Sequence, residues 1–266
     1  MELTIFITSL LLLLGLLSGV ISAIAGIGGG VFFVSIMTLL FYIPINIAVD
    51  TSTFIILFSA FAGFITYLRQ KRTTIKLSLI FSGFSILGSI LSTIIFSFVS
   101  VDNLVLKLIF ALTLFIAGFN MIYKANKSSQ QNNKQENKPL EFFLNIQDNK
   151  LNFKKSIPLF ILAGFTANLL GIGGGIINTP SLNLVLGFPI HNSTAISTSI
   201  IFFTAIYNTV IKSFFGRIDY LIGFIIAIGS IIGSILGAKI SKRIPKRLLQ
   251  YFVAAVLLVL ALRMFF

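Results

Sequence analysis

The segment Gly26-Ile27-Gly28-Gly29-Gly30 decides the fold, because the chain contains it twice. Gly171-Ile172-Gly173-Gly174-Gly175 repeats it letter for letter 145 positions later, and apolar sequence flanks both copies. Glycine destabilises the interior of a helix by about 1 kcal/mol relative to alanine. A helix interrupted inside a bilayer also exposes backbone N–H and C=O groups that must be buried in protein or line a wet cavity. Matched interruptions in two matched halves are typical of a transporter's substrate site.

The composition is that of a polytopic membrane protein. Of the 266 residues, 56% are hydrophobic and 10% are charged, with a mean hydropathy of +1.02, whereas soluble domains carry about 25% charged residues. The net charge of +13 comes from short basic clusters between apolar runs, a distribution that favours contact with anionic membrane lipid over nucleic acid. Because the chain has no cysteine and one histidine, we expect no disulfide, no metal site and no cofactor.

The two halves of the chain align at a single offset of 145 residues. The matching pairs are Gly19 and Gly164, Pro44 and Pro189, Ser52-Thr53 and Ser197-Thr198, and Arg72 and Arg217. An ungapped offset of this length indicates duplication of a unit with about five hydrophobic segments. We therefore predict an all-α protein with a first transmembrane repeat (1–123), a polar, flexible cytoplasmic linker (124–155) and a second transmembrane repeat (156–266), because the linker contains too little apolar surface to fold alone.

The hydrophobic segments of the first half differ in length. Residues 4–24, 75–98 and 104–123 are long enough to cross a bilayer, as is the segment with a polar start that ends near Leu68. Residues 31–43 would cover roughly 20 Å as a helix, so we expect a half-helix, a tilted span or one arm of a re-entrant hairpin. The number of full crossings stays open at this point.

The distribution of charge between the segments predicts the orientation. The dense basic loop at 69–76 and the linker belong inside, which places the turn at Asp102 and the stretch 44–50 outside. The second half then starts inside and is inverted, with its basic turn at 239–247 inside and its sparsely charged turn at 212–219 outside. If the short arms did not return across the bilayer, the halves would be parallel. The charge pattern favours inverted repeats.

Each glycine run is followed by a restarting helix whose first N–H groups have no partner within that helix. The positive end of the helix dipole would point toward the middle of the membrane, and glycine removes the Cβ atoms that would keep a ligand at a distance. These features predict a binding site for a small anion. The candidate substrate-binding residues are Gly28, Gly29, Gly30, Ser52, Thr53, Gly173, Gly174, Gly175, Asn178, Ser197 and Thr198.

Each of these interpretations has a structural alternative. Glycines in membrane helices often serve only close packing, and serine and threonine often bond a carbonyl of their own helix. Asp50, the acidic residue nearest the site, is a candidate for proton coupling or a helix cap. His191 is either an exposed loop residue or a pH-sensitive gate.

These residues resemble the TauE/SafE family of membrane proteins, also called the sulfite exporter family, over nearly the whole chain outside the linker. The residues that carry the resemblance are Gly19, Gly26 to Gly30, Ala48 to Ser52, Gly164, Gly171 to Gly175, Pro180-Ser181-Leu182, Gly187 and Ala195 to Thr198. Ser35 departs from the pattern, because it stands where the second half has Pro180. The resemblance implies transport of small sulfur-containing or organic anions such as sulfite, sulfoacetate or thiosulfate.

The leading functional hypothesis is a secondary transporter in the cell membrane, an exporter that works by alternating access at a site between the repeats. No nucleotide-binding motif is present, so a proton or the membrane potential would drive it. An anion channel of the same architecture is the alternative. A membrane-embedded enzyme is poorly supported, because one histidine, no cysteine and few acidic residues leave little material for metal or acid–base chemistry.

Overall fold

All regular structure in the described part of this computed structural model is helical. The described residues are 5–98, 102–131, 150–241, 244 and 246–265. The helices of the first half are α1 (Ile5–Ala25), α2 (Gly30–Leu39), α3 (Ile45–Arg69), α4 (Ile75–Phe98) and α5 (Asn103–Gln131). Those of the second half are α6 (Lys150–Leu170), α7 (Gly175–Pro180), the π-helical turn η2 (Ser181–Val185), α8 (Ile190–Phe214), α9 (Tyr220–Ile240) and α10 (Lys246–Phe265).

The chain is a multi-pass membrane protein. Among the described residues, six helices are long and apolar enough to cross a bilayer: α1, α3, α4, the part of α5 up to Ile122, α8 and α9. Many of their large apolar side chains are exposed, including Leu13, Leu87 and Ile228. Large exposed apolar surfaces are rare on soluble monomers and are the normal contact surface with lipid.

The helix bounds follow the offset of the sequence. Both α6 and α8 begin and end 145 residues after α1 and α3, and α7 begins 145 residues after α2. Pro44 and Pro189 lie directly before α3 and α8 with nearly the same backbone angles, as expected for a residue that cannot donate a helical N–H bond. The second restart differs from the first, because it changes to the π-helical turn at Pro180.

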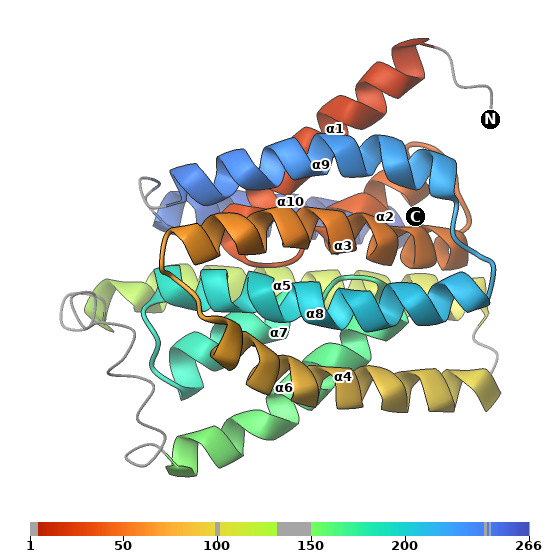
Figure 1. The fold of residues 1–266 in the computed structure, drawn as a ribbon. Coiled ribbons are helices and arrows are strands. Elements are labelled where there is room, and N and C mark those ends of the chain that lie inside the picture. The colour runs from red at the N-terminus through yellow and green to blue at the C-terminus, as the bar shows by residue number, and fades with distance from the viewer. Residues whose placement is uncertain (1–4, 99–101, 132–149, 242–243, 245, 266) are drawn as a thin grey trace.

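The helices pack in pairs, and one of these pairs lies at the centre of the molecule. In Figure 1, α3 and α8 lie side by side in the middle of the molecule, with α1 and α9 along one side and α4 and α6 along the other. A third pair, α5 and α10, packs behind them. At the offset of 145, α1 against α9 corresponds to α6 against α4, so the flanking pairs are equivalent contacts.

The central helices α3 and α8 run antiparallel. At one end of the pair, Asp50 of α3 contacts Lys212 near the end of α8. At the other end, Arg72 just after α3 donates to the carbonyl oxygen of His191 at the start of α8. We call these the Asp50 end and the Arg72 end. Antiparallel equivalent helices are what inverted repeats require, and the orientation of the chain in the membrane stays a prediction.

Close packing of the flanking pairs depends on glycine. A Cβ atom on Gly19 would overlap the carbonyl oxygen of Ser230, and one on Gly164 would overlap that of Ser85. Small residues let helix backbones approach closely in a membrane, where van der Waals packing replaces the hydrophobic effect between helices. For these glycines, packing is a sufficient explanation.

The structure adds detail to three sequence-based expectations. The short segment after the first glycine run is the ten-residue helix α2. The ends of the predicted linker are helical, because α5 continues to Gln131 and α6 begins at Lys150, while 132–149 lie outside the described residues. Lys212 was assigned to a turn and His191 to a loop, but both lie in α8, because this helix fills the whole interval between Pro189 and Phe215.

Candidate functional site

The two glycine segments form equivalent turns between helices. Their positive φ angles are 67°, 98° and 75° at Gly26, Gly28 and Gly29, and 63°, 81° and 76° at Gly171, Gly173 and Gly174. Residues with a Cβ atom rarely adopt this left-handed region, whereas glycine does so readily. The backbone of each turn therefore requires glycine at these positions.

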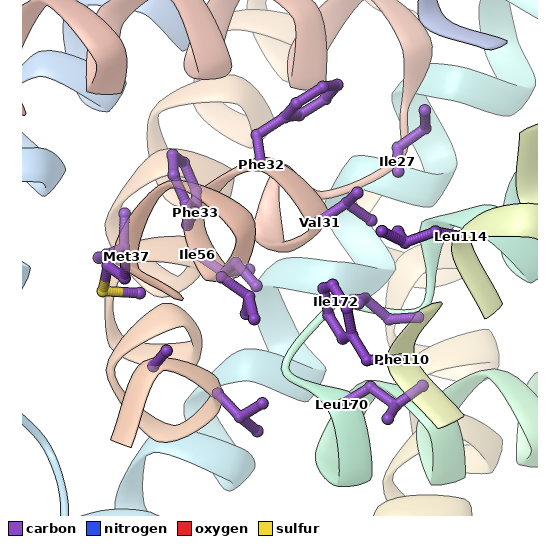
Figure 2. Packing of buried hydrophobic residues seen from close by; sticks show 14 of the residues in the cluster. Ile27, Val31, Phe32, Phe33, Met37, Ile56, Phe110, Leu114, Leu170 and Ile172 are labelled. Atoms are coloured by element: carbon purple, nitrogen blue, oxygen red, sulfur yellow. The ribbon is translucent and has the colours of Figure 1, made fainter. Parts of the chain in front are cut away.

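The turns meet in the interior of the bundle. A Cβ atom on Gly28 would lie 3.4 Å from the Cα of Gly173, and one on Gly173 would lie 3.4 Å from the Cα of Gly28. Figure 2 shows the apolar side chains around this meeting point. They are Ile27 and Val31 beside the first turn, Leu170 and Ile172 beside the second, and Phe110 and Leu114 of α5 against them.

The contact between the turns is backbone against backbone. A Cβ atom on Gly30 would overlap the carbonyl oxygen of Gly171, and one on Gly175 would overlap that of Gly26. Neither Gly30 nor Gly175 has a positive φ, so here glycine is required by the close approach of the opposite half. The remaining pair, Gly29 and Gly174, faces atoms of its own half.

Hydrogen-bond donors remain at both turns. No hydrogen bond within the described residues uses the backbone N–H groups of Gly28, Gly29, Gly30 or Val31, or of their equivalents Gly173, Gly174, Gly175 and Ile176. Asn178 is 1% exposed, and neither atom of its side-chain amide has a partner in the described part of the chain. Buried polar groups are nearly always paired, so unpaired donors at a helix start are groups that a bound acceptor could satisfy.

The predicted serines link the halves reciprocally. Ser52 donates to the carbonyl oxygen of Gly171 at 2.7 Å, and Ser197 donates to that of Gly26 at 2.9 Å. The oxygen of Gly26 also accepts from Thr179 at 2.9 Å. In this state the two serines hold the turns together.

The predicted threonines bond within their own helices. Thr53 donates to the carbonyl oxygen of Asp50, and Thr198 donates to that of Thr194. Because each hydroxyl already donates its proton, its oxygen can only accept hydrogen bonds, whereas an anion needs donors. Substrate contact by these threonines and by the serines stays a prediction.

We expect Ser52→Ala to destabilise the protein more than Ser197→Ala does. Ser52 is the one described donor to the oxygen of Gly171, so its loss leaves a buried carbonyl unpaired, at about 1–3 kcal/mol. Gly26 keeps the bond from Thr179 after Ser197→Ala, and we expect about 1 kcal/mol. Thermal unfolding of the two variants in detergent checks the order, and equal midpoints would contradict it.

A cavity of about 470 Å³ opens at the Asp50 end. Its polar lining comes from α3, α4, α6, α8 and the α8–α9 connection, namely Asn46, Asp50, Thr93, Asn168, Lys212 and Arg217. Val49 also lines it, and a Cβ atom on Gly171 would overlap the carbonyl oxygen of Val49. The inner part of the cavity therefore reaches the neighbourhood of the second glycine turn.

An ion pair lies in this cavity. Lys212 Nζ is 3.0 Å from Asp50 Oδ1, and Arg217 Nε is 4.0 Å from Asp50 Oδ2. Asp50 and Lys212 are buried, whereas the Arg217 side chain is 53% exposed. Asp50 is not the cap of its helix, because α3 begins after Pro44. Two cationic groups thus face a cavity that can admit an anion.

Lys212, Arg217 and Asn168 were not predicted as site residues from the sequence, although Arg217 is the repeat equivalent of Arg72. One signal for Lys212 was available, because an ionisable residue within an apolar span is expensive and usually functional. The pairing with Asp50 joins residues 162 positions apart, and only the packing of α3 against α8 brings them together.

A narrow polar path continues from the cavity toward the turns. Lys212, Asn208 and Thr204 lie on successive turns of α8. Thr204 and Asn208 line a smaller space with Thr53 and Gly173 that is too narrow to admit a water molecule. Asn208 Oδ1 is buried there without a partner among the described residues. The connection between cavity and turns is polar but closed.

A buried arginine lies at the Arg72 end of the bundle. Arg72 is 4% exposed and donates to Ser241 Oγ at 2.6 Å and to the carbonyl oxygen of His191. Its guanidinium lies 4.7 Å from the centre of the Tyr67 ring, and Tyr67 Oη donates to the carbonyl oxygen of Ala23 at 2.6 Å. Burial lowers the pKa of Arg72 from its usual value. This cluster links α1, α3, α8 and α9.

Arg72 and Arg217 occupy equivalent positions at the offset of 145, but their surroundings differ. Arg72 is buried and hydrogen-bonded, whereas Arg217 is exposed beside an open cavity. The Asp50 end therefore opens to a cavity with three charged groups. The hollows toward the Arg72 end, about 40 Å³ beside Gly175 and Thr194 and about 690 Å³ beside Arg69 and Lys239, leave Arg72 itself buried.

The chain is similar in sequence to known membrane proteins. It is 25% identical over 235 residues to the probable membrane transporter protein YunE of Bacillus subtilis, with 83% of this chain and 84% of the relative covered. It is 26% identical to the probable membrane transporter protein YdhB of the same organism (83% and 85% covered). It is 28% identical to the probable membrane transporter protein MJ0441 of Methanocaldococcus jannaschii (74% and 69% covered).

No solved structure matches the chain. Residues 11–264 match the family described as sulfite exporter TauE/SafE, a range that includes both glycine turns and all or most of every helix. All three relatives are named as probable membrane transporter proteins, and a polar cavity near paired turns is a feature expected of a transporter. The chain is a membrane transporter protein of the TauE/SafE sulfite exporter family.

Proposed function

We propose that this protein is a secondary transporter that exports small sulfur-containing or organic anions, such as sulfite, by alternating access. The observation that carries the proposal is the cavity with Lys212 and Arg217, which reaches toward paired glycine turns with free N–H donors. An anion attracted by the cations would be bound by backbone N–H groups at the start of a helix, where the dipole also favours negative charge.

The difference between the two ends supports alternating access. The polar cavity opens at the Asp50 end, whereas Arg72 is buried and hydrogen-bonded at the other end, and loop charge predicts that the two ends face outside and inside respectively. Because the two ends are built from equivalent segments, exchange of their states would open the Arg72 end and close the other. The anion site between the turns would then face each side in turn.

Closure between the cavity and the turns favours a transporter over a channel. The space lined by Asn208 and Gly173 does not admit water, and Arg72 blocks the far end. A channel needs a continuous hydrated path, and this state has none within the described residues. We propose no enzymatic activity for the chain.

Uptake by proteoliposomes tests the proposal. We expect saturable entry of radiolabelled sulfite, thiosulfate or sulfoacetate, at least ten times faster than into protein-free liposomes. Unlabelled anion inside should accelerate entry, because exchange allows the carrier to return loaded. Entry that is not accelerated, and that carries a steady current, would favour the channel. Absence of entry for all three anions would contradict the proposal.

A further inference from the structure

The ammonium of Lys212 has more N–H donors than it has hydrogen-bond partners in this state. It carries three N–H donors, and Asp50 is its one charged partner within hydrogen-bonding distance among the described residues. Both side chains are nearly buried, and both line the cavity. A buried ammonium is stable only with an anionic partner close by.

An anion in the cavity would compete with Asp50 for that ammonium. The cavity reaches Lys212 from the mouth, where Arg217 is exposed. A sulfur oxyanion at Lys212 would place its charge beside the carboxylate, and two like charges at this distance repel strongly in a medium of low dielectric constant. A proton on Asp50 removes this repulsion and frees the ammonium for the anion.

The charge of the site supports binding of the anion together with a proton. Asp50, Lys212 and Arg217 carry one positive charge together. The helices α4 and α6 contribute only uncharged groups, including Thr93 and Asn168. Asp219, near Thr51, caps α9 by accepting from the N–H of Ile222. A monoanion bound with one proton leaves the charge of the site unchanged.

The pair exists at one end of the bundle only. At the offset of 145, the position equivalent to Asp50 is Ala195 and that equivalent to Lys212 is Tyr67. Arg217 has an equivalent in Arg72, so cationic attraction is shared by both ends. The carboxylate of Asp50 and the ammonium of Lys212 have no equivalents at the Arg72 end. A coupling role for this pair is therefore distinct from the features that both halves share.

From this geometry we infer that Lys212 is an anion-binding residue whose partner, Asp50, exchanges its charge for a proton when the anion arrives. The protein is therefore a proton–anion cotransporter in which one proton moves with each anion. Export follows when the outward anion gradient exceeds the inward proton gradient, and an acidic exterior reverses the direction. This inference rests on the proposed transport function. It names the residues that bind the anion at the Asp50 end and the ion that drives the movement.

The test separates movement of the anion from its coupling to protons. Radiolabelled thiosulfate is a suitable probe, because it stays a dianion across the pH range used. With one proton it carries a net charge of −1, so valinomycin and equal K⁺ on both sides hold the membrane potential at zero. Exchange against unlabelled thiosulfate without a pH gradient measures movement. Accumulation driven by an acidic exterior measures coupling. Wild-type protein should perform both.

The variants have distinct expected results. Asp50→Asn should lose accumulation to a greater extent than exchange, because the carboxamide cannot take up and release a proton. Lys212→Gln should raise the KM for thiosulfate at least tenfold. The double variant Asp50→Asn/Lys212→Gln leaves no unpaired buried charge and should exchange weakly without accumulation. Asp102→Asn, which removes an exposed carboxylate, is the matched control and should behave as wild type.

Each outcome decides the inference. Accumulation by the double variant at the wild-type level would overturn it. So would an Asp50→Asn protein that is folded and loses exchange and accumulation to the same extent, because the carboxylate would then be needed for movement itself. Absence of exchange by wild-type protein with thiosulfate and with sulfite would remove the proposed function, and this inference with it.

Discussion

Gly30→Ala and Gly175→Ala are each expected to abolish anion flux. The added methyl group would overlap the carbonyl oxygen of Gly171 in the first variant and that of Gly26 in the second. A backbone oxygen cannot move aside as a flexible side chain can, so the two turns must separate. Overpacking of this kind destabilises a protein by about 1–3 kcal/mol, and we expect flux to fall at least tenfold.

Gly83→Ala is the matched control for these two variants. Gly83 lies in α4 with no atom within 4 Å of an added Cβ, and alanine is the better helix former by about 1 kcal/mol. The control should transport normally and unfold at the wild-type temperature or above it. Wild-type flux in both turn variants would mean that the contact between the turns has no part in transport.

Much of the helical framework could be predicted from the sequence. The expected segment 75–98 coincides with α4, and the interruptions predicted at the glycine runs are the gaps before α2 and α7. These features are local, because hydropathy, proline and glycine act within a few residues of their own position. The first four segments of each half begin at the same offset of 145, whereas α10 begins 143 residues after α5.

The contents of the site could be predicted less completely. The glycine runs indicated a binding site from local sequence, but the role of a hydroxyl depends on which carbonyl lies opposite. Ser52 and Thr53 are neighbours, yet Ser52 reaches across to Gly171 as well as to Val49 of its own helix, whereas Thr53 bonds within its own helix. The pair formed by Asp50 and Lys212 depends on the register of α3 against α8, which no single segment encodes.

The different environments of Arg72 and Arg217 could not be predicted from the alignment of the halves. An alignment makes them equivalent, whereas one is buried and the other is exposed. Such a difference belongs to a conformational state, because a protein that alternates between two states must break its own symmetry in each. One sequence must be compatible with both conformational states, whereas the structure shows one of them.

Arg72→Gln is expected to open the closed end of the bundle. The substitution removes the bonds from the guanidinium to Ser241 and to the carbonyl oxygen of His191, and its contact with the Tyr67 ring. Hydrogen bonds to a charged group contribute about 1.5–3 kcal/mol each. The loss of one such bond therefore favours the open state by about tenfold or more.

Labelling of single cysteines measures this opening, because the native chain has no cysteine. Thr93→Cys lines the cavity, and its repeat equivalent, Ala238→Cys, is fully buried beside Tyr67. A water-soluble maleimide should react at least ten times faster with Thr93→Cys than with Ala238→Cys. Adding Arg72→Gln should accelerate the reaction at Ala238→Cys and slow the reaction at Thr93→Cys, because the two ends exchange their states.

Arg69→Gln is the matched control, because Arg69 is an exposed cation at the same end of α3. It should leave both labelling rates unchanged. If Arg72→Gln accelerates the reaction at both positions, the substitution loosens the bundle without shifting an equilibrium between states. If it changes neither rate, Arg72 is a packing residue and the closed end is held by other contacts. Opposite changes at the two equivalent positions are the result that only alternating access explains, since a general loss of stability cannot protect Thr93→Cys.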